Sequence, residues 1–287
     1  MFKSLSAGAI GVSGSTREIA ELAGRHGFRA IDFNAAEAAD LIDAGQLDSL
    51  KSLYATNGLR VAAMGLPVQF RGDAETFDRD LAALPRLAAA AGAMGCDRCA
   101  TWILPASDEL TFEENFELHR SRLAACATVL GAEGIRLGLE FVGPATSRAG
   151  KKHEFIYDMA GMLGLCEAIG TGNAGLLLDC WHWYCTEGTV EQIAALRAEQ
   201  VVLVHVNDAP AGLAVDEQVD NRRAMPGQTG VIDIAGFLGA LARIGYDGPV
   251  MAEPFSDAVR ALPPDEAVRA TSDSLDKIFA LAGVTPS

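Results

Sequence analysis

The sequence predicts an α/β protein, a (β/α)8 TIM barrel formed as a single domain over residues 1–287. Apolar runs of strand length alternate with amphipathic helical stretches, which is typical of a parallel sheet covered by helices. Eight such pairs follow one another without a change in composition, which favours closure into a barrel. The alternative, an open nucleotide-binding sheet, would need a G-x-G-x-x-G loop after its first strand. The spacing Gly8-x-x-Gly11-x-x-Gly14 does not provide that loop.

The first half of the chain supplies four of the expected pairs. Ser15 and Glu18 form a capping box, so a helix is expected to begin there. The strands are expected at residues 7–12, 28–33, 59–64 and 97–102. The longer helices of this half are expected over residues 36–55, 74–94 and 109–132.

The second half of the chain continues the alternation and contains one long polar loop, over residues 208–229. Strands are expected at residues 135–140, 175–179, 201–205 and 248–253. Helices are expected over residues 154–169, 189–198, 233–243 and 263–282.

The composition excludes several classes of protein. A net charge of −15 argues against a nucleic-acid partner, because binding a phosphate backbone needs clustered Lys and Arg. No run approaches the roughly 20 apolar residues of a membrane span, and the first residues do not form a signal peptide. We therefore expect a cytoplasmic protein. Its six cysteines, including the pair Cys96-x-x-Cys99, are expected to be reduced thiols that pack in the core.

Each of the last four predicted strands ends on a side chain that can bind a metal. These residues are Glu140, Asp179, His205 and Glu253. The carboxyl ends of barrel strands form one mouth, so the four side chains are expected to meet there. Three clustered carboxylates repel one another, and a divalent cation relieves that repulsion. A mixed carboxylate and imidazole set suits Mn²⁺, with Mg²⁺, Co²⁺ or Zn²⁺ as alternatives.

Such an ion polarises a carbonyl group and stabilises an enediolate. Proton transfer beside a carbonyl also needs a base within hydrogen-bond reach, and Glu140 and Glu253 are the candidates for this catalytic role. His182, three residues after Asp179, is a candidate for binding a substrate oxygen. Trp102 is a candidate wall of a sugar pocket. One of the neighbours Arg222 and Arg223 is expected to reach the substrate, and the other to be solvated.

Several motifs over nearly the whole chain carry a resemblance to a known family. They are Leu139-Glu140, Leu178-Asp179-x-x-His182, Val204-His205-Val-Asn-Asp208, Arg223-x-x-Pro-Gly-x-x-Gly-Val-Ile-Asp233 and Gly245-Tyr-Asp-Gly-x-Val-x-x-Glu253. With them the chain resembles the xylose-isomerase-like barrel superfamily. The most similar group is that of the sugar phosphate isomerases and epimerases, which includes ketose 3-epimerases and inosose isomerases and dehydratases.

The resemblance implies one metal ion held by the four strand-end residues, with the two glutamates moving the proton. It also implies that His182 and Arg223 hold substrate oxygens, and Asp208 is a further candidate for substrate binding. The chain departs from the ketose 3-epimerase pattern, because 18 positions separate His205 from Arg223. A homodimer or homotetramer is expected from the resemblance. The substrate is expected to be a small sugar or cyclitol, without a phosphate group.

Four functions compete on these residues. The favoured one is a metal-dependent isomerase or epimerase of a ketose, keto-cyclitol or related sugar. A lyase or dehydratase that acts on a keto-sugar, keto-glycoside or inosose through the same site is the alternative. A sugar-binding barrel without catalysis would not need the complete set of ligands. Endonucleases of the superfamily that cut abasic DNA need more than the five histidines of this chain.

Overall fold

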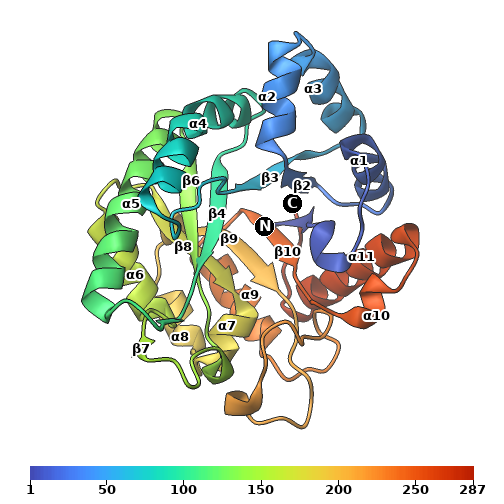
Figure 1. The fold of residues 1–287 in the computed structure, drawn as a ribbon. Coiled ribbons are helices and arrows are strands. Elements are labelled where there is room, and N and C mark those ends of the chain that lie inside the picture. The colour runs from blue at the N-terminus through green and yellow to red at the C-terminus, as the bar shows by residue number, and fades with distance from the viewer.

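The structure, a computed structural model, describes residues 1–287 and contains a closed barrel of eight parallel strands (Figure 1). Around the barrel the strands follow the order β1-β10-β9-β8-β6-β4-β3-β2, and β2 pairs with β1 to close it. The (β/α)8 prediction is therefore confirmed. The barrel strands are Phe2–Leu5 (β1), Ala30–Phe33 (β2), Arg60–Gly65 (β3), Arg98–Ile103 (β4), Arg136–Phe141 (β6), Ala174–Asp179 (β8), Val201–Val206 (β9) and Pro249–Ala252 (β10).

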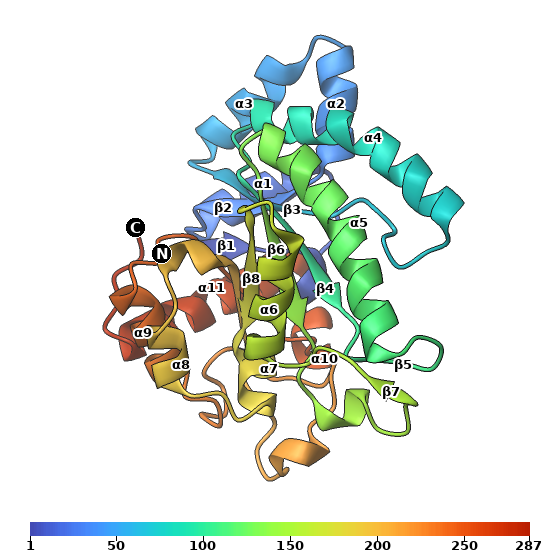
Figure 2. The same cartoon turned by 90° about the vertical axis from the view of Figure 1, so that its left-hand side faces the viewer.

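Helices surround the barrel on its outer side, as Figures 1 and 2 show. The predicted capping box of Ser15 and Glu18 starts the first of them. The α-helices are Thr16–Arg25 (α1), Ala35–Asp43 (α2), Leu47–Thr56 (α3), Ala74–Ala93 (α4), Phe112–Ala132 (α5), Met159–Ile169 (α6), Cys180–Cys185 (α7), Val190–Ala194 (α8), Ile234–Arg243 (α9), Asp257–Arg260 (α10) and Pro264–Leu281 (α11). None of these helices is both long and apolar enough to cross a lipid bilayer.

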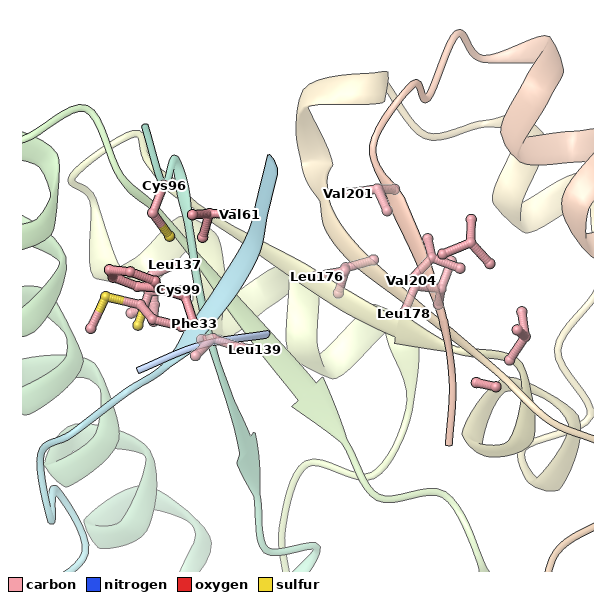
Figure 3. Close-up of a cluster of buried hydrophobic side chains, with 14 of the residues drawn as sticks. Phe33, Val61, Cys96, Cys99, Leu137, Leu139, Leu176, Leu178, Val201 and Val204 are labelled. Carbon is pink, nitrogen blue, oxygen red and sulfur yellow. The ribbon is translucent and has the colours of Figure 1, made fainter. Parts of the chain in front are cut away.

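Buried apolar side chains form two layers, one on each side of the sheet. The larger layer lies between the strands and the helices, and Figure 3 shows part of it, with Leu137, Leu139, Leu176 and Leu178 on neighbouring strands. A second cluster of seven buried residues fills the inside of the barrel: Phe2, Ala30, Ala62, Ala63, Leu177, Leu203 and Met251. Because side chains alternate along a strand, this inner layer fixes which residues face the axis at the mouth.

The expected first strand at residues 7–12 is wrong. The strand is β1, and Gly8–Ile10 instead forms a short 3-10 helix (η1) on the way to α1. β1 is not recognisable in the sequence because the charged residue Lys3 interrupts its apolar pattern. Its Nζ donates to Ser272 Oγ at 2.9 Å and to Asp276 at 2.7 Å, so α11 supplies the partners that allow its burial.

Other boundaries also differ from those expected. The helix expected over residues 36–55 is two helices, because Gly45 adopts a φ of +70° between α2 and α3. The helix expected over residues 189–198 ends earlier, as α8, and the 3-10 helix Ala198–Gln200 (η3) precedes β9. The short helix α7 was not expected. All six cysteines are free thiols, and five of them are buried.

Loops at the carboxyl ends of the strands cover the mouth of the barrel. The strands Ala106–Ser107 (β5) and His153–Glu154 (β7) pair there as a small antiparallel sheet. The 3-10 helices Ala145–Ser147 (η2) and Val215–Glu217 (η4) also lie in these loops. The loop over residues 208–229, coloured orange, projects from the same lower end of the molecule as β7 in Figure 2.

Candidate metal centre and active site

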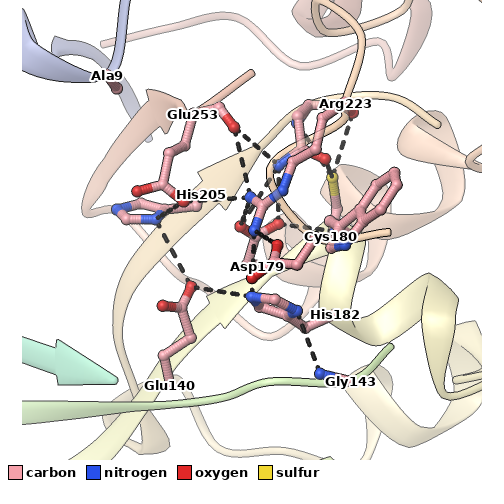
Figure 4. Close-up of polar contacts among 12 residues, drawn as sticks. Ala9, Glu140, Gly143, Asp179, Cys180, His182, His205, Arg223 and Glu253 are labelled. Carbon is pink, nitrogen blue, oxygen red and sulfur yellow. Dashed lines mark hydrogen bonds and ion pairs between the residues drawn. The ribbon is translucent and has the colours of Figure 1, made fainter. Parts of the chain in front are cut away.

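The four residues expected to bind a metal come together at the mouth of the barrel (Figure 4). They come from four neighbouring strands: Glu140 from β6, Asp179 from β8, His205 from β9 and Glu253 from the residue after β10. One donor atom of each side chain lies within 4.8 Å of the others. The register explains this proximity, because Asp179 pairs with His205, and His205 with Met251. The four residues therefore lie together because their strands end at the same height along the barrel axis.

Arg223 reaches this cluster from the long loop, with a side chain that is only 1% exposed. Its Nη1 donates to Asp179 Oδ2 at 2.8 Å and to Glu253 Oε2 at 3.1 Å. Its Nη2 donates to Asp220 Oδ1 at 2.7 Å. The neighbouring Arg222 is exposed, so Arg223 is the arginine in the site. The loop folds back over the mouth, so Arg223 contacts the cluster although 18 positions separate it from His205.

Asp179 is held in place by two groups of the protein besides Arg223. The backbone N–H of Trp181 donates to Oδ1 at 2.7 Å, at the start of α7. Asn207 Nδ2 donates to the same oxygen at 3.0 Å and to Oδ2 at 3.4 Å. Both Asp179 and Asn207 are fully buried. Asn207 was not singled out from the sequence, although it lies two residues after His205.

The two glutamates have opposite pKa shifts. Burial, followed by the charge of Glu253, raises the pKa of Glu140 well above its usual range. Burial also acts to raise the pKa of Glu253, but His205 and Arg223 outweigh it and leave the pKa lowered. Burial acts to lower the pKa of His205. The carboxylates of Glu253 and Glu140 act more strongly in the opposite direction and raise the pKa to about 9. In this arrangement Glu140 favours its protonated form and Glu253 its ionised form.

The residues present fit a divalent cation. Glu140 Oε1 and His205 Nδ1 are buried without a hydrogen-bond partner, and they lie 3.7 Å apart. Buried polar atoms are rarely left unpaired in proteins. The two atoms therefore mark a position at which one bound ion would contact both. When Glu140 is ionised and His205 neutral, the forms that bind a metal, three carboxylates face the single guanidinium of Arg223 and leave an excess of negative charge. Oxygen and imidazole donors in this combination are those of Mn²⁺, Mg²⁺, Co²⁺ or Zn²⁺ sites.

His182 lies beside the cluster on α7, and its side chain is 2% exposed. The backbone N–H of Gly143 lies 3.2 Å from Nδ1, and Nη2 of Arg223, which can only donate, lies 3.3 Å from Nε2. Burial and the charge of Arg223 lower the pKa of His182 to about 3, which keeps the ring neutral. Nε2 lies 3.9 Å from Glu140 Oε1, and His182 lines the cavity next to Glu140. His182 therefore lies between Arg223 and Glu140 at the edge of that cavity.

Two adjoining cavities open over the cluster. One, of about 280 Å³, occupies the barrel axis, and the other, of about 410 Å³, extends under the long loop. Glu140, Glu253 and Trp102 line both cavities. Trp102 is 45% exposed, and the Arg71 guanidinium lies 4.3 Å from the centre of its ring. The predicted wall residue thus lies at the mouth and borders both cavities, with one face of its ring against Arg71.

Asp32 on β2 also lines the axial cavity and was not singled out from the sequence. The surrounding protein raises its pKa to about 6, against the opposing effect of Ser6, although the side chain remains exposed to the cavity. The signal was the same as for Glu140, an acid near the end of the apolar run Ala30–Phe33. No other predicted strand in the first half of the chain carried a similar acid, so Asp32 was not recognised.

Asp208 has contacts that differ from those expected of a substrate-binding residue. It is fully buried, and it lines neither cavity over the cluster. Its carboxylate accepts hydrogen bonds from the backbone N–H groups of Ala209, Thr229, Gly230 and Ile232, at 2.8–3.1 Å. Asp208 therefore fastens the two ends of the long loop, and its oxygens have no free direction for a substrate.

Comparisons with known proteins agree with this architecture. A family model described as xylose isomerase-like TIM barrel matches residues 20–278. An inosose isomerase from Halalkalibacterium halodurans is 23% identical over 235 residues, which are 79% of this chain and 78% of that protein. A 3-dehydroshikimate dehydratase from Pseudomonas aeruginosa is 36% identical over 132 residues, 45% of this chain. The chain spans only 19% of the length of that dehydratase.

Solved structures share the fold over nearly the whole chain. A xylose isomerase domain protein from Alicyclobacillus acidocaldarius has a TM-score of 0.86 and 29% identity, with 99% of both chains covered. The crystal structure of an IOLI protein with a bound zinc atom has a TM-score of 0.79 and 19% identity, with 98% of both chains covered.

Proposed function

The chain belongs to the xylose isomerase-like TIM-barrel family, and on that premise we propose that it is a divalent-metal-dependent isomerase or epimerase of a ketose, keto-cyclitol or related sugar. One observation carries the proposal. Glu140 and Glu253 stand at the two ends of the same four-strand arc, and each places a carboxylate oxygen within 4.8 Å of donor atoms of Asp179 and His205. Two carboxylates that flank one bound substrate can act as base and acid in turn.

In this proposal Glu140, Asp179, His205 and Glu253 hold the ion, Mn²⁺ in the first place. Mg²⁺, Co²⁺ and Zn²⁺ are alternatives, and a protein of the same fold, IOLI, has a crystal structure with a zinc atom. A bound ion would polarise the substrate carbonyl as a Lewis acid.

The residues of the chain divide the remaining work. One of the two glutamates takes the proton from the carbon beside the carbonyl, and the other returns one from the other side. His182 forms a hydrogen bond with a substrate oxygen from beside Glu140. Arg223 has a buried Nε–H without a partner, which can donate to a second oxygen. Trp102 covers an apolar face of the sugar at the mouth.

A dehydratase or lyase is the second candidate, supported by the 36% identity with the 3-dehydroshikimate dehydratase. Asp220, from the long loop, lines the cavity next to Glu253 and could serve as the acid for a leaving group. Both reactions begin with the same proton abstraction, so their products distinguish them.

The test is incubation of the Mn²⁺-loaded protein in D₂O with ketoses, keto-cyclitols and 3-keto-glycosides, followed by NMR. We expect deuterium on a carbon beside the carbonyl with the carbon skeleton intact. Release of water or of an aglycone would assign the protein to the lyases instead. Glu140→Gln and Glu253→Gln should each abolish exchange, whereas Glu113→Gln, at an exposed glutamate of α5, should not. Exchange at the wild-type rate in either site variant would overturn the roles of the glutamates.

The cytoplasmic location and the homodimer or homotetramer remain predictions. Light scattering on the purified protein tests the second of them directly.

A further inference from the structure

The four strands that hold the cluster form one continuous half of the barrel, and the other half contributes one ionisable side chain to the lining of the axial cavity. β10, β9, β8 and β6 are consecutive, and β4, β3, β2 and β1 complete the circle. Asp32 is the only acid or base from that second half among the residues that line the axial cavity. β2 lies four strands from β8, so Asp32 stands across the barrel from Asp179.

Beyond Asp32 the cleft continues into a third cavity, of about 520 Å³, larger than either cavity over the cluster. Asp32, Phe33, Met64 and Gly65 line both this cavity and the axial one, so the two adjoin. The third cavity lies between the first turns of α1 and α2 and the loop after β3. The proposed reaction at the cluster has no use for this space.

The lining of the third cavity resembles the surface that a sugar ring prefers. Polar groups of Thr16, Asn34 and Glu37 stand beside Asp32, and Thr16 Oγ1 donates to Glu37 Oε2 at 2.5 Å. Apolar side chains form the rest, namely Ile19, Ile31, Ala35, Ala36, Met64, Pro67 and Leu87. A ring with hydroxyls at its edge and C–H groups on its faces matches such a mixture.

The charges of this cavity disfavour an anion. Two helix N-termini meet here, and such ends often bind phosphate. Here Ser15 accepts the Glu18 N–H of α1, and Asn34 accepts the Ala36 and Glu37 N–H groups of α2. Glu18 and Glu37 add negative charge to the same first turns. No Lys, Arg or His lines the cavity, and phosphate or carboxylate binding would need such a partner.

We propose that this cavity is a second subsite, which binds an uncharged, hydroxyl-rich ring attached to the sugar unit that reacts at the cluster. The preferred substrate is then a glycoside or another two-ring sugar. Asp32 stands at the junction of the two units and accepts a hydrogen bond from a hydroxyl there. This assignment rests on the proposed function for the identity of the reacting unit.

Isothermal titration calorimetry on the Mn²⁺-loaded protein tests the second subsite without requiring turnover. The probes are fructose, fructose 6-phosphate and three disaccharides in which fructose carries a hexose at its third, fourth or sixth carbon: turanose, lactulose and isomaltulose. We expect at least one disaccharide to bind about tenfold or more tightly than fructose. Fructose 6-phosphate should gain nothing over fructose.

Two variants locate the gain. Ala36 is exposed in the first turn of α2, and Ala36→Trp places an indole ring in the third cavity. It should reduce the affinity of the best disaccharide to that of fructose. Asp32→Asn should weaken the same disaccharide severalfold without adding bulk. Ala55→Trp, at an exposed alanine of α3 that does not line the cavity, is the matched control and should bind every probe as the wild type does.

The second subsite is overturned if no disaccharide binds more tightly than fructose, if no probe binds, or if Ala36→Trp and Asp32→Asn keep the full gain. Tighter binding of fructose 6-phosphate than of any disaccharide would overturn the uncharged ligand. Failure of the proposed function has a separate sign, the absence of deuterium exchange in D₂O with every sugar, and calorimetry does not depend on it.

Discussion

The substitution Arg223→Met tests whether the arginine and a metal ion share the same carboxylates. The guanidinium is 1% exposed and pairs with Asp179, which is fully buried, and with the partly buried Glu253 and Asp220. Removing one partner of a buried ion pair typically costs about 3–5 kcal/mol, because the remaining charges stay desolvated. Since a domain of this kind has about 5–15 kcal/mol of stability, the variant should fold but unfold at much lower urea concentrations.

Mn²⁺ should restore much of this loss. A ligand at 100 times its Kd stabilises a folded protein by about 2.7 kcal/mol. The variant has lost the competing positive charge beside Asp179 and Glu253, so it should bind the ion more tightly and gain more stability from it than the wild type. The assay is urea unfolding of both proteins, each without metal and with about 1 mM Mn²⁺.

The matched control is Arg86→Met, because Arg86 pairs with Asp40 and Asp43 on the exposed surface. This variant should lose little stability and respond to Mn²⁺ as the wild type does. The reasoning is refuted if Arg223→Met unfolds at the wild-type urea concentration. It is equally refuted if Mn²⁺ stabilises the Arg223 variant no more than the wild type.

Three further substitutions test other parts of the account. Gly143→Ala places a Cβ 2.4 Å from the carbonyl oxygen of His182, so we expect lost turnover with Mn²⁺ binding retained, which activity and metal titrations measure separately. Asp208→Asn should cost about 2 kcal/mol and expose the loop over residues 208–229 to proteases, because a neutral amide weakens its bonds to four backbone N–H groups. Burial lowers the pKa of His119 to about 4, so the unfolded chain, with a histidine pKa of about 6.5, binds the proton first. Stability from this group is present above pH 6.5 and is lost as the pH falls towards 4, and His119→Leu should remove about 3 kcal/mol of that dependence in urea unfolding.

The sequence was sufficient to predict the barrel and the four residues of the cluster. Each of these residues ends an apolar run, and in a parallel barrel the position along a strand determines the level at the mouth. Glu140 and His205, for example, needed no knowledge of a distant partner. Their strands are apolar on both faces because helices cover one side and the inner layer fills the other.

The errors have long-range causes. β1 contains Lys3, which is buried only because Asp276 lies beside it, 273 residues away in the chain. Asp208 was identified as a special position, but its role depends on N–H groups up to 24 residues further on. Asp32 had the right pattern and lacked companions in sequence, since its neighbours at the mouth come from the other half of the barrel.

The most direct test of the metal centre is titration of the purified protein with Mn²⁺, followed by electron paramagnetic resonance of the free ion. We predict one tightly bound ion per chain in the wild type and a large loss of affinity in Asp179→Asn. Asp216→Asn, at an exposed aspartate of η4, should bind as the wild type does. A wild-type protein that binds no ion, or an Asp179→Asn variant with undiminished affinity, would contradict a metal site at these four residues.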